Sequence, residues 1–299
     1  MRRLRIRRSL LFIPGNNPNM MINAPVLGAD TVIFDLEDAV SHDDKDAARV
    51  LVRNALRWIK RGDMELCVRV NDIATPYWEQ DFEMIIPAKP DGLIIPMVNY
   101  PDKLEEMSAR AGRIERGSGL RENQIKFLPI IETAMGIENA FAIAQSCRGR
   151  LDAMMIGGED LATDLVAIRD TKDNRELLYG RGRVLNAARA AGLTPIDTAY
   201  ADVEDIEAFT RDTMYSRQIG YAGRGVVSPR QVRIANEAYS PSAKDIEYAR
   251  EVMEVYEEGK AAGKGAVSLR GKMIDTPILI RARQVLAFAE MMKGRDGNG

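Results

Sequence analysis

Eight short apolar runs recur along the chain, and each of them ends in polar or glycine-rich residues. Their near-continuous apolar character is typical of strands in a parallel sheet that is buried on both faces. We therefore predict strands over residues 9–15, 31–37, 65–71, 92–98, 126–132, 153–160, 194–200 and 225–229.

Most of the intervals between these runs are long enough for a helix that crosses back over the sheet. Residues 43–61 and 139–147 are two such intervals. Parallel strands need crossover connections of this kind. Strands that alternate with helices eight times predict an α/β fold, a (β/α)8 TIM barrel. A doubly wound open sheet is the alternative that the pattern leaves open.

The C-terminal part of the chain has a different pattern. A charged helical run covers residues 243–262, Gly263-Lys264-Gly265 interrupts it, and a further helix begins at Pro277. No long linker precedes this part. We therefore predict a TIM-barrel catalytic domain over residues 1–240 and a C-terminal helical extension over residues 241–299.

Composition narrows the class of protein. The 299 residues include 42 Lys and Arg against 44 Asp and Glu, a formal net charge of −2. This balance argues against a protein that coats nucleic acid. No stretch reaches the roughly 18 apolar residues of a membrane helix. Residues 2–8 are rich in arginine, but the apolar run that follows them is too short for a signal peptide. We expect a cytoplasmic protein without nucleic-acid or membrane partners.

Cysteine and histidine are scarce. Cys67 and Cys147 stand far apart and outside any Cys-x-x-Cys pair, so we expect neither a disulfide nor a structural zinc site. The one histidine, His42, excludes a His-rich metal site and disfavours a Ser-His-Asp triad. Its place before a predicted helix, among acidic neighbours, favours an exposed surface role.

Charged residues gather where the predicted strands end, which is where a barrel carries its catalytic groups. Two carboxylates with waters or substrate oxygens suit Mg²⁺, which prefers oxygen ligands. An arginine beside the metal suits a substrate carboxylate, which it binds through two parallel hydrogen bonds. The charged and polar residues at these ends are Asp35, Glu37, Asp38, Arg69, Asn71, Glu132, Glu159 and Asp160.

Structural roles compete with the functional ones. Acidic residues at strand ends also cap the next helix, and Asp38 or Asp160 would then do only that. For Arg69, the alternative is an internal ion pair with one of the carboxylates. Asn16 is either a ligand contact or a turn residue. The Gly157-Gly158 pair allows close approach of a ligand to the backbone, but alone it is a weak signal.

Taken together, these residues resemble the citrate lyase β subunits within the citrate lyase/malyl-CoA lyase (HpcH/HpaI aldolase) family. The resemblance covers almost the whole chain, and no single segment is diagnostic. Its strength lies in the order of the matching segments, which fall on predicted strand ends and on the C-terminal part. They are residues 8–16, 34–40, 68–71, 131–134, 158–160 and 271–275.

The resemblance implies a TIM barrel, assembled into trimers, that cleaves a carbon–carbon bond in a 3-hydroxyacyl thioester. It implies Mg²⁺ ligands at Glu132 and Asp160 and a substrate-carboxylate ligand at Arg69. Glu132, Asn16 and Gly158 are further candidate substrate contacts.

The resemblance also assigns acidic catalytic candidates. Glu37 and Asp38 match acidic positions close to the site, and Asp275 matches a lid aspartate that reaches the active site of a neighbouring subunit. Without the resemblance, residues 271–275 would be assigned to a loop and Asp275 to the N-cap of a helix that begins at Pro277.

Some positions depart from the family pattern. Ser228 and Arg224 stand where many relatives have His and Lys, although citrate lyase β subunits often lack that His. Asn19 and Asn23 stand where some enzymes that use free CoA carry lysines near the nucleotide. This favours a thioester bound to a carrier protein, with the N-terminal arginines as an alternative source of phosphate contacts.

The expected function is Mg²⁺-dependent cleavage of citryl-ACP or citryl-CoA to oxaloacetate and an acetyl thioester. Citrate lyase α and γ subunits are possible partners, and a homo-oligomer, trimer or hexamer, is expected. One alternative is a stand-alone malyl-CoA or citramalyl-CoA lyase, or a related acyl-CoA thioesterase. The other is a carrier-protein docking subunit that is active only in a complex.

Overall fold

The computed structural model describes residues 5–170, 172–261 and 267–296, with side chains up to residue 293. The chain divides into two compact units, Met1–Tyr239 and Ser240–Gly299. Among the described residues, the first unit contains a closed barrel, and the second contains two helices and a short hairpin.

The barrel consists of eight parallel strands whose order in the sheet follows the sequence. β1 pairs with β8 as well as with β2, so the sheet is closed and the open-sheet alternative is wrong. The prediction of a (β/α)8 TIM barrel is confirmed. The strands are β1 (Ser9–Pro14), β2 (Thr31–Asp35), β3 (Glu65–Arg69), β4 (Gly92–Ile95), β5 (Lys126–Ile131), β6 (Ala153–Ile156), β7 (Thr194–Asp197) and β8 (Gly223–Val226).

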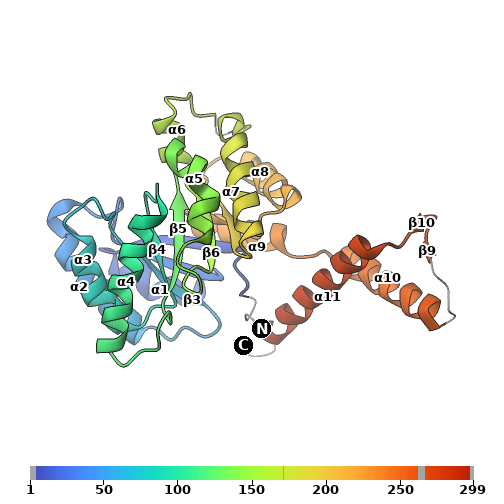
Figure 1. The fold of residues 1–299 in the computed structure, drawn as a ribbon, viewed down its shortest axis with the longest axis horizontal. Coiled ribbons are helices and arrows are strands. Elements are labelled where there is room, and N and C mark those ends of the chain that lie inside the picture. The colour runs from blue at the N-terminus through green and yellow to red at the C-terminus, as the bar shows by residue number, and fades with distance from the viewer. Residues whose placement is uncertain (1–4, 171, 262–266, 297–299) are drawn as a thin grey trace. The chain divides into compact units, whose positions relative to one another are not determined.

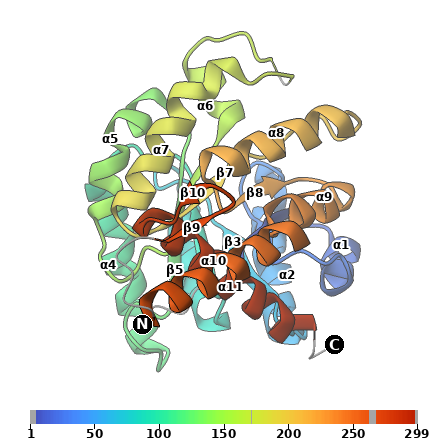
Figure 2. The same ribbon diagram turned by 90° about the vertical axis from the view of Figure 1, so that its right-hand side faces the viewer.

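Helices surround the barrel (Figure 1, Figure 2). α2 shows why: its buried residues Ala48, Val52 and Leu56 recur every fourth position and form one apolar face. None of the described helices is long and apolar enough to cross a membrane. The helices are α1 (Pro18–Asn23), α2 (Lys45–Trp58), α3 (Trp78–Ile85), α4 (Pro101–Gly117), α5 (Ala134–Gln145), α6 (Gly158–Asp164), α7 (Leu178–Ala190), α8 (Ile206–Ile219) and α9 (Pro229–Tyr239), with 3-10 segments η1 (Ala24–Val26), η2 (His42–Asp44), η3 (Ile86–Ala88) and η4 (Arg175–Leu177).

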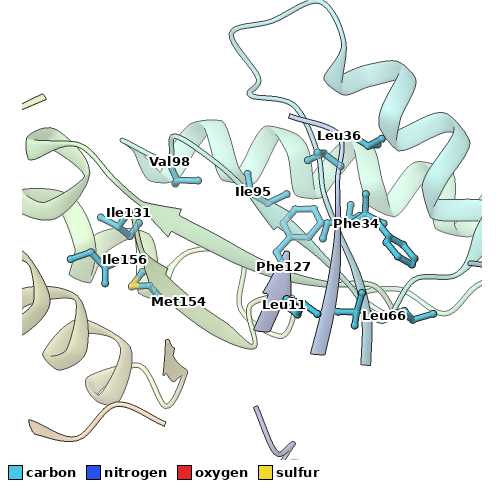
Figure 3. Packing of buried hydrophobic residues seen from close by; sticks show 14 of the residues in the cluster. Leu11, Phe34, Leu36, Leu66, Ile95, Val98, Phe127, Ile131, Met154 and Ile156 are labelled. Carbon is cyan, nitrogen blue, oxygen red and sulfur yellow. The ribbon is translucent and has the colours of Figure 1, made fainter. Parts of the chain in front are cut away.

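Side chains of the strands alternate between two apolar layers. Leu10, Ile33 and Cys67 belong to a small cluster of strand residues that fills the barrel interior. Their neighbours Leu11 and Phe34 belong to the larger layer between strands and helices (Figure 3). Both cysteines are free, as expected. The barrel interior is therefore packed, and room for chemistry is left at the strand ends.

Arginines of the N-terminal segment hold the opposite end of the barrel together. Arg7 contacts Glu65, the first residue of β3, at 2.7 Å and Asp152, just before β6, at 2.6 Å. Arg8 pairs with Asp30, just before β2, at 2.8 Å. Carboxylates of the protein therefore engage these two arginines, and a phosphate contact by an N-terminal arginine stays a prediction. Arg2 and Arg3 lie outside the described residues.

The second unit has its own small core. α10 (Ala243–Ala261) and α11 (Thr276–Asp296) pack through Val252, Leu279 and their neighbours. β9 (Ser268–Leu269) and β10 (Lys272–Met273) form an antiparallel hairpin, so the loop predicted over residues 271–275 is wrong in part. Arg270 and Gly271 make its turn with positive φ angles of 51° and 77°. The break predicted at Gly263-Lys264-Gly265 lies outside the described residues.

Candidate active site

The carboxyl ends of β2, β3, β5 and β6 bring together an arginine and several carboxylates. Asp35 ends β2 and Arg69 ends β3, and the two lie opposite each other in the sheet register. Glu132 directly follows β5. Asp160 lies in the first turn of α6, so the prediction that the sixth strand reaches Asp160 is wrong. The strand ends at Ile156 because a helix begins at Gly158.

Arg69 is the cationic centre of this group. Its Nε and Nη2 donate to the two oxygens of Asp35 at 2.7 and 2.6 Å, which is the bidentate geometry of a strong charge-assisted pair. Its Nη1 lies 3.0 Å from Glu37 and 3.3 Å from Asp38. The internal ion pair considered for Arg69 is present, and it leaves one edge of the guanidinium directed at two further carboxylates.

The segment after β2 is fixed from both sides. Asp35 accepts the backbone N–H groups of Glu37 at 2.9 Å and Ala39 at 3.1 Å. The buried Lys45 of α2 donates from Nζ to the carbonyl oxygens of Leu36 and Glu37 at 2.7 and 2.8 Å. Because these bonds order the backbone, the acidic side chains stand at fixed positions beside Arg69.

Glu37 and Asp38 differ in environment. The side chain of Glu37 is 15% exposed and that of Asp38 is 70% exposed. Burial raises the pKa of Glu37 to about 9, although the charge of Arg69 acts in the opposite direction. A protonated Glu37 still accepts a hydrogen bond from Arg69 through its carbonyl oxygen. At neutral pH a protonated Glu37 therefore adds no negative charge beside the guanidinium.

Glu132 is buried and held by the backbone. One carboxylate oxygen accepts the N–H of Met97 at 2.7 Å, and Met97 adopts a positive φ of 53°. A Cβ at Gly157 would lie 2.4 Å from the other oxygen of Glu132. Any side chain at position 157 would collide with the Glu132 carboxylate, so the position requires glycine. The sequence had suggested instead that the glycine allows close approach of a ligand.

Glu132 and Asp160 lie close enough for each carboxyl group to affect the pKa of the other. Burial raises the pKa of Glu132 to about 7, with a further contribution from the charge of Asp160. Burial also raises the pKa of Asp160, and the charge of Asp38 adds to it. A divalent cation between the two carboxyl groups would offset the negative charge of both.

The donor set fits a hard cation with an incomplete protein shell. Across the described residues, no group of three or more His, Cys, Asp or Glu side chains is arranged to hold a metal ion. A cation between Glu132 and Asp160 would therefore need waters or substrate oxygens to complete its coordination. Mg²⁺ is bound in this way in many enzymes, through one or two carboxylates.

Thr198 is a residue that sequence reasoning missed. Its Oγ1 accepts the N–H of Gly158 at 2.8 Å and donates to the carbonyl of Ala199 at 3.1 Å. A Cβ at Gly158 would lie 2.8 Å from the same Oγ1. The N–H of Gly158 is thus engaged by Thr198, while a substrate contact at Gly158 stays a prediction. Through this bond Thr198 fixes the start of the helix that carries Asp160.

A buried ion-pair network stands behind Thr198. Asp197 accepts the N–H of Thr198 at 2.9 Å and is itself bound by Arg181. Arg224 donates to the carbonyl of Thr198 at 3.1 Å, and Asp212 pairs with Arg181 at 2.8 Å and with Arg224 at 3.0 Å. Arg224, which departs from the family pattern, is therefore a buried structural residue. The only sequence signals of this network were the charged residues Asp197 in β7 and Arg224 in β8.

Other predicted residues have structural partners or are exposed. Asn71 is buried and bonds to Asp81 through its backbone N–H and its side-chain amide. Asn16 is exposed and donates to Asp44 at 3.3 Å, so its role as a substrate contact stays a prediction. His42 is exposed, as expected, and lies 3.2 Å from the hydroxyl of Tyr77.

Asp275 lies in the second unit and is exposed. Its Oδ1 accepts the N–H of Ile278 at 3.1 Å, so the residue caps the N-terminus of α11 as its position before Pro277 predicted. Capping does not exclude catalysis, because a carboxylate has a second oxygen. The catalytic role implied by the family resemblance stays a prediction.

The chain resembles known proteins over almost its whole length. The sequence signature of the family HpcH/HpaI aldolase/citrate lyase matches residues 8–229. Citrate lyase subunit beta from Leuconostoc mesenteroides subsp. cremoris is 37% identical over 295 residues, 99% of this chain and 97% of that protein. (3S)-malyl-CoA thioesterase from Cereibacter sphaeroides is 36% identical, covering 95% of this chain and 94% of that protein. Mitochondrial citramalyl-CoA lyase from Mus musculus is 31% identical, covering 96% of this chain and 87% of that protein.

A solved structure shares the fold. The protein CitE from Mycobacterium tuberculosis, in complex with magnesium, acetoacetate and coenzyme A, matches with a TM-score of 0.77 and 25% identity. The match covers 94% of this chain and 97% of that chain. That protein binds magnesium and a CoA compound within the same architecture.

The role of Thr198 can be tested with a substitution that keeps its shape. Thr198→Val removes the acceptor of the Gly158 N–H, and we expect affinity for Mn²⁺ or Mg²⁺ to fall by about tenfold, as for partners of metal ligands. Thr198→Ser retains the hydroxyl and should restore the affinity. The measurement is metal titration by calorimetry.

Thr31→Val is the matched control for this test. Thr31 is fully buried at the amino-terminal end of β2 and donates to Glu65 at 2.9 Å. Both Val variants should lose stability by about 1–3 kcal/mol, the cost of an unsatisfied buried group. Only Thr198→Val should lose metal affinity, and equal affinities in the two variants would contradict the positioning role.

Proposed function

Because the chain belongs to the HpcH/HpaI aldolase/citrate lyase family, we propose that it cleaves a citryl thioester to oxaloacetate and an acetyl thioester. Membership of the family makes the protein an aldolase or lyase. The observation that carries the narrower proposal is the 37% identity to a citrate lyase subunit beta over 99% of the chain. The thioester is carried by an acyl carrier protein or by CoA.

The cofactor in this proposal is Mg²⁺, held by Glu132 and Asp160. Support comes from the neighbouring carboxylates of buried Glu132 and exposed Asp160, which affect each other's pKa, and from the all-oxygen donor set. When bound, Mg²⁺ supplies Lewis acidity for the hydroxyl and carboxylate oxygens of the substrate. The hydrogen bond from Met97 orients Glu132, and the bond between Gly158 and Thr198 orients the turn that carries Asp160.

Arg69 binds a carboxylate of the substrate in this proposal. Asp35 holds two nitrogens of the guanidinium, so Nη1 is presented in a fixed direction. Because Glu37 keeps its proton at neutral pH, it competes only weakly with an anionic substrate for Nη1. The positive charge also offsets the negative charge that develops on the thioester during cleavage. Asp38, more exposed, completes the acidic rim of the site.

Cleavage requires two proton movements. The hydroxyl of the substrate loses its proton, the carbon–carbon bond breaks, and the electron pair of that bond passes to the carbon next to the thioester. Addition of a proton to this carbon gives the acetyl thioester, and the former hydroxyl carbon becomes the ketone of oxaloacetate. We assign this acid and base role to Asp275 of a neighbouring subunit, in a trimer or hexamer, because its carboxylate is exposed.

The reaction can be tested by product analysis. Supplied with citryl-CoA and Mg²⁺, the protein should release oxaloacetate and acetyl-CoA in equal amounts. Asp160→Asn should lower kcat by about a hundredfold or more, because metal activation contributes several kcal/mol to the barrier. Chromatography of both products checks this.

Glu159→Gln is the matched control for the product assay. Glu159 is the neighbour of Asp160 in the same helical turn, but it is exposed and pairs with Arg169 at 2.9 Å. This variant should keep the wild-type rate. Full activity of Asp160→Asn, or of the wild type in excess chelator, would contradict the metal assignment.

The same assay separates the alternatives. Faster cleavage of malyl-CoA or citramalyl-CoA than of citryl-CoA would identify a stand-alone lyase. These two thioesters are tested because relatives of the chain are named for them. Release of free CoA without a 2-oxo acid would identify a thioesterase. Turnover only after addition of citrate lyase α and γ subunits would identify a docking subunit within a complex.

The assignment of Asp275 to a neighbouring subunit can be tested by mixing inactive chains. Asp275→Asn keeps the helix cap, because Asn caps as well as Asp, but it cannot act as acid or base. Alone, Asp275→Asn and Asp160→Asn should both be inactive. Co-expressed with two different tags and purified as mixed oligomers, they should regain activity, because one subunit supplies the metal site and the other supplies Asp275.

A pair of variants in the same site provides the control for mixing. Glu132→Gln and Asp160→Asn both damage the metal site, so their mixed oligomers should stay inactive. Absence of activity in the Asp275→Asn and Asp160→Asn mixture would contradict action between subunits.

A further inference from the structure

A cavity of about 660 Å³ lies at the end of the barrel opposite the candidate active site. Its wall includes Lys126, the first residue of β5, and Asp91, which precedes β4. Strands run from this end toward Arg69 and Glu132, so the cavity and the candidate active site lie at opposite ends of the same sheet. Nothing in the proposed reaction uses this cavity.

Positive charge predominates in the wall of the cavity. Two carboxylates, Asp91 and Glu122, face a larger number of cations that come from five separate stretches of the chain. The N-terminal segment, the connections before β3, β4 and β5, and β5 itself each contribute one. These cations are Arg5, Arg61, Lys89, Arg121 and Lys126.

The charges of two of these cations are already balanced. Arg61 pairs with Asp91 at 3.0 Å, and Arg5 pairs with Glu65. Lys126 donates to the carbonyl oxygen of Gly149 at 2.7 Å, so this lysine is also engaged within the protein.

Lys89 and Arg121 carry the remaining positive charge, and Glu122 is the carboxylate of the wall that lies outside the Arg61–Asp91 pair. Among the described residues neither side chain has a hydrogen bond or ion pair, and both residues are exposed. The backbone at Lys89 is nevertheless fixed: its N–H bonds to Ile86 at 3.0 Å, and its carbonyl accepts from Arg61 at 2.7 Å. Lys89, on a fixed backbone, and Arg121 thus both line the same cavity, and neither has a partner among the described residues.

We propose that this cavity binds a small polyanion, a compound with two or more phosphate or carboxylate groups. The volume lies within the range of small-molecule sites, about 300–1,000 Å³. Guanidinium groups bind phosphate and carboxylate oxygens in pairs, and ammonium groups add point charges. A diphosphate or a tricarboxylate in the cavity would neutralise Lys89 and Arg121 together.

The bound anion would also link segments that are far apart in the sequence. Lys89 precedes β4 and Arg121 precedes β5, so one ligand would tie two loops of the barrel to each other. A ligand that binds only the folded state raises its stability. The site would therefore act as an effector site, separate from the catalytic end, and it does not depend on the proposed reaction.

Titration of the full-length protein tests this proposal. Inorganic pyrophosphate and citrate, each without metal and at low salt, are titrated by calorimetry, and thermal melting is followed in parallel. At least one of the two should bind and raise Tm, and the one that binds identifies the ligand as phosphate or carboxylate. Added salt should weaken the binding, because exposed charges are screened.

Charge reversal locates the binding. Lys89→Glu combined with Arg121→Glu should weaken it by about tenfold or more, equivalent to about 1.4 kcal/mol. The control, Arg211→Glu with Arg233→Glu, makes the same change in net charge on the exposed faces of α8 and α9 and should bind as the wild type does. Lys89→Gln with Arg121→Gln, a milder pair, should show an intermediate loss.

Three results would overturn the proposal. They are absence of binding of both anions to the wild type, equal weakening in the reversal and control variants, and unchanged binding in the reversal variant. The third result would mean that the anion binds elsewhere, for example at Arg69. None of these results bears on the cleavage of a citryl thioester, so the two proposals can fail independently.

Discussion

The bidentate ion pair between Arg69 and Asp35 is the interaction around which the candidate active site is built. It joins the ends of β2 and β3, and Asp35 also orders the backbone that carries Glu37 and Asp38. One guanidinium then faces more carboxylates than it can neutralise. Burying that excess is costly unless a proton or another cation is present. Burial raises the pKa values of Glu37 and Glu132, the charges of neighbouring carboxylates add to both shifts, and the same excess favours a divalent metal.

Charge is sorted along the axis of the barrel, which the net charge of −2 conceals. At the amino-terminal end, Arg7 and Arg8 are matched by buried carboxylates, and the cavity there has surplus positive charge. At the carboxyl end the surplus is negative, with Arg69 as the counter-charge. Between the two ends the interior is apolar. Opposite surpluses at opposite ends allow one fold to bind a cation and an anion at separate places.

The sequence was sufficient for the fold and for part of the site. Apolar runs such as residues 31–37 identify strands because a doubly buried strand has few polar positions. Polar residues at their ends identify Arg69 and Glu132 for the same reason. The contribution of Gly157 was not predictable, because it depends on a carboxylate 25 positions earlier in the chain. The role of Thr198 was not predictable either, because it depends on a hydrogen bond from the N–H of Gly158, a partner that only the structure identifies.

Binding of Mn²⁺, followed by electron paramagnetic resonance, is the sharpest test of a divalent-cation site at Glu132 and Asp160. We expect one ion per chain, held more tightly at pH 8 than at pH 6, because the pKa of Glu132 is raised to about 7 and the cation must displace a proton. Replacing both carboxylates, Glu132→Gln with Asp160→Asn, should abolish this binding. Binding that persists in the double variant, or that does not change with pH, would mean that these two residues do not hold the cation.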